Sequence, residues 1–127
     1  MSGLAVLFYR DGRSAEPDAI GAMIDAVPHR GPDGVETQLI GAVGLGYAKL
    51  ATTPEEATGR QPFTSARTGC VVIADARLDN RDDLLARLPD HPSSAASDAE
   101  IILRAYEAWG VDVAVHLLGD FAFVIWD

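Results

Sequence analysis

The chain has 127 residues, 48% of them hydrophobic, so it is long enough for one domain with its own core and too apolar for a disordered segment. Its 19 acidic and 10 basic side chains give a net charge of −9, which argues against a nucleic-acid or membrane-binding surface. A single cysteine excludes an intrachain disulfide, and no apolar run approaches the roughly 18 residues of a membrane span. We therefore expect a cytoplasmic protein.

The first half of the sequence predicts three strands and one helix. Residues 4–9 are apolar throughout, as in a strand that is covered on both faces. A helix is predicted to begin at Pro17, because proline suits the first helical position, and to stop at Pro28. Two further strands are predicted at 35–40 and 43–50.

The second half predicts a buried strand at 70–74 and two helices. Asn80 is the expected N-cap of a short helix that continues to Leu88. Residues 97–100, Ser-Asp-Ala-Glu, have the pattern of a capping box, which predicts a helix that stops at Gly110.

The end of the chain predicts a short helix at 111–118 and a last strand at 121–127. Because this strand is apolar on both faces, we expect it to be central in a sheet. A chain that ends on a central strand indicates either a partner strand added from elsewhere or a truncated domain. We expect residues 1–127 to leave an unpaired apolar edge that needs a continuation or a partner.

Ser2 is the first candidate for a catalytic residue. Removal of Met1 would place its hydroxyl beside a free α-amino group, whose ordinary pKa is about 7.7–8.0. A hydroxyl and an amine in this position are the nucleophile and the base of N-terminal-nucleophile hydrolases. Small residues also commonly follow an initiator methionine, so the position alone leaves an ordinary second residue as the alternative.

A set of short motifs, taken in order, carries a resemblance to a known family. They are Ser2-Gly3, 29–34 (HRGPDG), 46–50 (GYAKL), 79–81 (DNR), 97–100 (SDAE), 105–110 (AYEAWG) and 118–127 (LGDFAFVIWD). The chain closely resembles the class II glutamine amidotransferase domain that begins asparagine synthetases, β-lactam synthetases and lasso-peptide macrocyclases. The resemblance covers residues 1–127. It implies an α+β fold, the four-layer αββα sandwich of N-terminal-nucleophile hydrolases, in a truncated form and without the synthetase domain.

The resemblance also implies a set of site residues. In active members residue two is cysteine, whose thiolate attacks the side-chain amide of glutamine, and the ammonia passes to an ATP-dependent synthetase domain. In this chain Ser2 stands in the nucleophile position, and a hydroxyl is much less acidic than a thiol. The corresponding glutamine pocket consists of Lys49, Thr53, Asp75, Ala76, Arg77 and Asp98.

Several pocket residues differ from those of active members. Lys49 replaces an arginine that binds the glutamine carboxylate. An arginine can donate two parallel hydrogen bonds to a carboxylate, whereas a lysine offers a single compact positive charge. Asp75 and Ala76 replace the Asn and Gly that donate to the oxyanion, and loss of one such donor costs ~10²–10³ in rate. Asp98 matches the ligand of the glutamine amine, but a carboxylate in the first turn of a helix also has a purely structural explanation.

Other polar residues are expected to be structural. Arg30 and Asp33 are predicted to form a salt bridge within their loop, with a role in the pocket wall as the alternative. No metal site is expected, because His29, His91 and His116 share no ligand spacing with each other or with the cysteine.

These departures predict a domain without glutaminase activity that has a structural role in an amide-forming enzyme of the lasso-peptide cyclase or β-lactam synthetase type. The alternatives are an active glutaminase that uses Ser2 and a free-standing half of a split synthetase. No cofactor is expected for this chain, and ATP and Mg are expected only for the synthetase domain. The expected partner is that domain or a separate synthetase chain; a second copy and a precursor peptide are further candidates.

Overall fold

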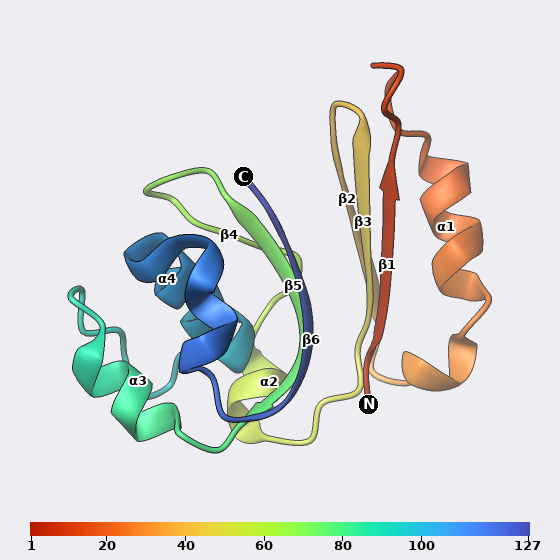
Figure 1. Cartoon of the computed structure of the whole chain (residues 1–127). Helices are drawn as coiled ribbons and strands as arrows, with labels where there is room; N and C mark the ends of the chain where they lie inside the picture. The colour runs from red at the N-terminus through yellow and green to blue at the C-terminus, as the bar shows by residue number, and fades with distance from the viewer. The chain divides into compact units, whose positions relative to one another are not determined.

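The strands form two three-stranded antiparallel sheets, each within one compact unit of the chain (Figure 1). The computed structural model describes all residues from 1 to 127, and the units are Met1–Thr52 and Thr53–Asp127. Each unit combines its sheet with helices, so the predicted α+β class is confirmed. No helix of the chain combines the length and the apolar character needed to cross a bilayer.

The first unit contains β1 (Gly3–Phe8), β2 (Val35–Ile40) and β3 (Val43–Ala48), with β3 in the centre. Helix α1 (Pro17–Asp25) packs against this sheet, and the short 3-10 helix η1 (Pro28–Arg30) follows it. All six residues of β3 are buried.

Two glycines of β3 allow α1 to pack closely on the sheet. A Cβ atom at Gly44 would lie 3.3 Å from the Cβ of Ile20, and one at Gly46 would lie 3.4 Å from Cγ1 of the same residue. Ile20 and Ile24 are accordingly buried in the core of this unit. The prediction that β1 is covered throughout is wrong at its end, where Phe8 is 52% exposed.

The second unit contains β4 (Phe63–Thr64), β5 (Val71–Leu78) and β6 (Gly119–Trp126), in that order across the sheet. Its helices are α2 (Pro54–Thr58), α3 (Arg81–Arg87), α4 (Asp98–Trp109) and the 3-10 helix η2 (Gly110–His116). Helices α3 and α4 lie on the same side of this sheet (Figure 1). The core between sheet and helices includes Val72, Ala74, Leu84, Ile101 and Ile102.

The last strand is at an edge and not in the centre of its sheet. β6 pairs with β5 alone, from Val71↔Trp126 to Leu78↔Gly119, and β4 occupies the opposite edge of β5. The prediction of a central strand is therefore wrong for residues 1–127. As expected, the chain has an apolar edge strand, since β6 has only one neighbouring strand.

Of the two helix N-caps predicted from the sequence, one is present and the other is not. Ser97 caps α4, because its Oγ accepts from the Glu100 amide at 3.3 Å. Asn80 makes no cap bond to α3. Its side chain instead donates to the carbonyl of His116 at 2.9 Å and accepts from the Leu118 amide at 3.0 Å, which ties the start of α3 to η2.

Helix α2 is absent from the sequence prediction. It is five residues long and begins at Pro54, and Thr53 caps it by accepting from the Glu56 amide at 3.2 Å. A capping-box spacing, threonine followed three residues later by glutamate, was the available signal.

Candidate functional site

Ser2 lies at the start of β1, and its hydroxyl is bonded within the first unit. Its Oγ is 3.1 Å from the Tyr47 hydroxyl and accepts from the Leu50 amide at 3.1 Å. Oγ also lies 3.4 Å from the Leu50 carbonyl, to which it donates. Because Ser2 is only 6% exposed, these contacts replace water around the hydroxyl. The group in the nucleophile position is thus engaged in packing the end of β3 against β1.

The loop at 29–34 holds the backbone around Ser2. Arg30 Nη1 donates to the Ser2 carbonyl at 3.4 Å, and Asp33 Oδ2 accepts from the Ala51 amide at 2.9 Å. No ion pair joins Arg30 to Asp33, so the predicted salt bridge is wrong. The two side chains bind the backbone of different segments instead. The Lys49 amide donates to the Gly34 carbonyl, and the Lys49 carbonyl accepts from the Asp33 amide, so the backbone after β3 is also bound to this loop.

Replacement of Ser2 by alanine tests the structural part of this arrangement. We expect Ser2→Ala to lower the free energy of unfolding by about 1–3 kcal/mol, because the buried Tyr47 hydroxyl and the Leu50 amide each lose a partner. Urea unfolding of the purified chain measures this. Ser14→Ala, at an exposed serine of the same unit, is the control. Equal stability of Ser2→Ala and the unchanged chain would contradict the expected role.

The second unit holds the other predicted pocket residues, three of them consecutive in β5. Ala76 packs against the core on the helix side, so alternation along the strand places Asp75 and Arg77 on the opposite face. Arg77 is largely exposed and forms ion pairs with Asp79 and Asp120, each at 3.1 Å. The hydrogen bond to Asp79 raises the pKa of Arg77. Two carboxylates therefore compensate this cation.

Thr53, also predicted to line the pocket, has a structural task in the same unit. Its hydroxyl is the cap of α2 described above. The side chain accepts a backbone hydrogen bond, a role that is common for threonine at this position.

Asp98 is the first residue of α4, and both of its carboxylate oxygens have partners within the chain. Oδ2 accepts from the Leu78 amide at 3.0 Å, and Oδ1 lies 2.5 Å from Nη1 of Arg81. Nη2 of Arg81 also donates to the carbonyls of Ser94, at 2.8 Å, and Ala96. Asp98 thus lies in the first turn of α4, as expected, and has structural partners there, and its role as a ligand of an amine stays a prediction.

The sequence pattern assigned Arg81 no task of its own. The ion pair spans 17 residues and crosses the loop before α4, so no periodicity or local spacing reports it. The only signal was an arginine within the aspartate-rich segment 79–83. In the structure, Arg81 places a positive charge at the carboxylate where the resemblance expects the α-ammonium group of glutamine.

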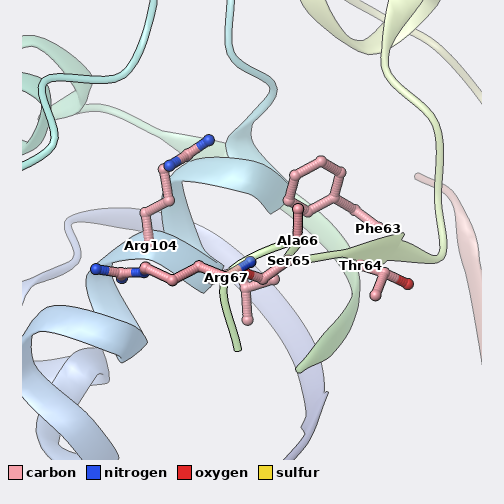
Figure 2. Close-up of a pocket in the computed structure, with 7 residues that line it drawn as sticks. Phe63, Thr64, Ser65, Ala66, Arg67 and Arg104 are labelled. Carbon is pink, nitrogen blue, oxygen red and sulfur yellow. The ribbon is translucent and has the colours of Figure 1, made fainter. Parts of the chain in front are cut away.

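A cavity of about 280 Å³ lies between α4 and the turn after β4 (Figure 2). Its lining consists of Phe63, Thr64, Ser65, Ala66, Arg67, Leu103 and Arg104. None of the residues predicted from sequence lines it. Arg67 pairs with Glu107, while Arg104 pairs with Asp90 and Glu100, so both cations of the wall are compensated by carboxylates.

Glu107 fastens the turn after β4 to α4. Its side chain is 2% exposed and accepts from the Ser65 and Thr68 hydroxyls, both at 2.5 Å, and from Arg67 at 2.6 Å. Burial alone would raise the pKa of Glu107, but the hydrogen bonds from these three residues outweigh it and hold the pKa below its ordinary value of 4.5.

The lowered pKa of Glu107 predicts that its contribution to the stability of the fold is lost in acid. Because the pKa of Glu107 is lower in the folded chain than in the unfolded one, its stabilisation is fully present above about pH 4.5 and is lost as the pH falls through the folded pKa. We expect Glu107→Gln to be less stable than the unchanged chain at pH 7, with a difference that shrinks below pH 4.5. Urea unfolding across this range measures it, with Glu36→Gln as the control at an exposed glutamate. A difference independent of pH would contradict the prediction.

A family model described as a glutamine amidotransferase domain matches residues 1–127. An asparagine synthetase [glutamine-hydrolyzing] of Asparagus officinalis is 34% identical over 124 residues, which is 98% of this chain and 21% of that protein. Asparagine synthetase [glutamine-hydrolyzing] 2 of Bacillus subtilis (strain 168) is 31% identical over 105 residues, 83% of this chain and 14% of that protein. Amidase chry2 of Gibberella zeae is 29% identical, with 100% of this chain and 21% of that protein covered.

The protein is thus of the class of glutamine amidotransferase-type domains with an N-terminal-nucleophile fold. The chain belongs to the glutamine amidotransferase domain family, and its relatives include asparagine synthetases and amidases. It spans about a fifth or less of the length of these three relatives.

Proposed function

We propose that this chain is the N-terminal glutaminase-like domain of an ATP-dependent amide-forming enzyme and that it does not release ammonia from glutamine. The length of the relatives supports a larger protein, since about four fifths of each lies outside the match. The synthetase part, in the same chain or a separate one, would bind ATP and Mg. The free, buried Cys70 fits a reducing compartment, and we propose the cytoplasm.

The pairing of Asp98 with Arg81 is the observation that carries this proposal. A glutamine amine that displaces Arg81 from Asp98 would compete with a guanidinium that also bonds to two carbonyls of the preceding loop. Hydrogen bonds to charged groups contribute about 1.5–3 kcal/mol, so displacement of Arg81 is costly. An ammonium placed beside Arg81 without displacing it would meet a like charge. Either way, the affinity for glutamine falls.

The other differences in the pocket act in the same direction. Asp75 puts a negative charge where active members donate a hydrogen bond to the oxyanion, so it opposes the charge that develops in the transition state. Lys49 offers a point charge in place of a bidentate fork. The Ser2 hydroxyl is a weaker nucleophile than a thiolate and is held by Tyr47 and Leu50.

A domain of this kind suits an enzyme whose amine is already part of its substrate. Lasso-peptide cyclases and β-lactam synthetases, the types that the motifs resemble, have no need of ammonia. The substrate of the synthetase part would then be a precursor peptide or a small amino acid derivative. The glutaminase-like domain would contribute structure to that enzyme and could also mediate contact with a second copy.

An active glutaminase is the second candidate, and the relatives favour it. Two of the three described above are named glutamine-hydrolyzing asparagine synthetases, with identities of 31% and 34%. In that case Ser2, freed of Met1, would attack glutamine directly.

Ammonia release from glutamine distinguishes the two candidates. The assay compares the unchanged chain, Ser2→Cys alone, and Ser2→Cys combined with Lys49→Arg, Asp75→Asn and Arg81→Ala, with removal of Met1 checked by mass spectrometry, and release by the unchanged chain would favour the active glutaminase. Loss of one oxyanion donor costs ~10²–10³ in rate, so we expect the single variant to be at least about a hundredfold slower than the combined one. Asp112→Asn, at an exposed aspartate, is the control for loss of a negative charge. Fast ammonia release by Ser2→Cys alone would show that the present pocket is adequate and would refute the proposal.

A further inference from the structure

Tyr47 brings a second hydroxyl to the group in the nucleophile position. Its oxygen lies 3.1 Å from Oγ of Ser2, although the two residues are 45 positions apart in the chain. Both side chains are shielded from water, since Tyr47 is 4% exposed and Ser2 6%. Water therefore competes little for either hydroxyl, and the hydrogen bond between them holds both groups in place.

The position of the Tyr47 ring is set by the centre of the first sheet. Tyr47 belongs to β3, where its backbone pairs with Leu4 of β1 on one side and with Glu36 of β2 on the other. Ser2 directly precedes β1. The same sheet thus positions both residues, so the contact between their hydroxyls belongs to an ordered part of the unit.

The contacts of Ser2 use the full hydrogen-bonding capacity of its hydroxyl, which has one proton and two lone pairs. Oγ accepts from the Leu50 amide and donates to the Leu50 carbonyl, so the Tyr47 hydroxyl is the donor to the second lone pair. If the proton of Ser2 is directed to Tyr47 instead, Tyr47 holds the proton that a base has to remove. With either orientation, attack on a substrate requires that the contact with Tyr47 is broken.

Of these two partners of Ser2, Tyr47 is the one that acts through its side chain. Leu50 contacts Oγ with its backbone amide and carbonyl, which most other residue types would also supply. Phenylalanine fills nearly the same space as tyrosine but has no hydroxyl. The residue type at position 47 therefore determines whether the hydroxyl of Ser2 is held from β3.

We propose that Tyr47 is a positioning residue that keeps the Ser2 hydroxyl unreactive, an inference that rests on the function proposed above. After removal of Met1, the free α-amino group would have to compete with Tyr47 for this hydroxyl before it could act as a base. One net hydrogen bond changes an equilibrium by roughly twofold to tenfold. The loss of activity thus extends from the glutamine pocket to the nucleophile position itself.

Oxidation by periodate measures the availability of the Ser2 hydroxyl. This reagent cleaves an N-terminal serine through its neighbouring amine and hydroxyl, which both have to be free to react, and mass spectrometry detects the aldehyde that remains. The chain without Met1, a residue that is 73% exposed, is compared with its Tyr47→Phe variant. We expect oxidation to be several-fold faster in Tyr47→Phe. Tyr9→Phe, at another tyrosine of the first unit, is the matched control and should leave the rate unchanged.

Acylation of the α-amino group of Ser2 separates the proposed role from a loosened fold. This reaction reports how accessible residue two is, and it does not require the hydroxyl. A general opening at the start of β1 would accelerate acylation and oxidation together. We expect the ratio of the oxidation rate to the acylation rate to rise in Tyr47→Phe and to stay constant in Tyr9→Phe.

Three results would overturn the inference. Equal oxidation rates with and without the Tyr47 hydroxyl would show that it does not restrain Ser2. Slower oxidation in Tyr47→Phe would show that Tyr47 activates the hydroxyl. A parallel rise in both reactions would leave Tyr47 with a packing role alone. The proposed function fails by a different measurement, namely ammonia release by Ser2→Cys alone, so the two failures are distinguishable.

Discussion

The carboxylate of Asp98 links three elements of the second unit, whose arrangement depends on it. It begins α4, accepts the amide of Leu78 at the end of β5, and pairs with Arg81 at the start of α3. Through Arg81 it also fixes the loop that leads into α4. Both partners are largely shielded from water, with side chains 17% and 22% exposed. Removal of one charge from such a pair leaves the other uncompensated, which costs more than the pair itself contributes.

Ser2 in the first unit, like Asp98 in the second, stands at a site position of the family and also makes structural contacts. Its hydroxyl bonds to Tyr47 and Leu50, so a polar residue is needed there whether or not it reacts. Each of these two positions thus has a structural reason for its residue type. Under the proposed function, Asp98 would be retained for its structural task, and Ser2 keeps a polar group at residue two although the cysteine of active members is absent.

Local patterns predicted the elements well where short-range physics decides. Strand β2 and the start of α4 lie where the sequence placed them, because alternation and the Ser97 cap act over a few residues. Two of the errors concern contacts distant in sequence. Asn80 has the residue type of an N-cap, yet bonds to the chain 36 and 38 residues later. An apolar run on both faces predicts burial, but it does not say that β6 has one neighbouring strand.

The same limit applies to the candidate site: its residues could be assigned by motif, but their contacts with distant residues could not be predicted. The resemblance assigned Ser2, Lys49, Asp75 and Asp98 to site positions by their motifs, but the sequence could not reveal that Arg81 compensates Asp98 across 17 residues. The expected bridge between Arg30 and Asp33 failed for a related reason. Two opposite charges near each other in sequence gain little from pairing in water, and both side chains found backbone groups to satisfy.

The segment 79–81 has three residues that each hold a different neighbour. The Asp79 amide and the Asn80 side chain bind the backbone at Leu118 and His116, and Arg81 binds the first residue of α4. One short turn therefore orders the chain before β6 and also occupies the carboxylate that the resemblance assigns to the amine of glutamine. Because these contacts hold the second unit together, a domain without glutaminase activity, as proposed above, would still require the turn. Under that proposal, Arg81 is retained for the fold, and the occupied carboxylate is a consequence of it.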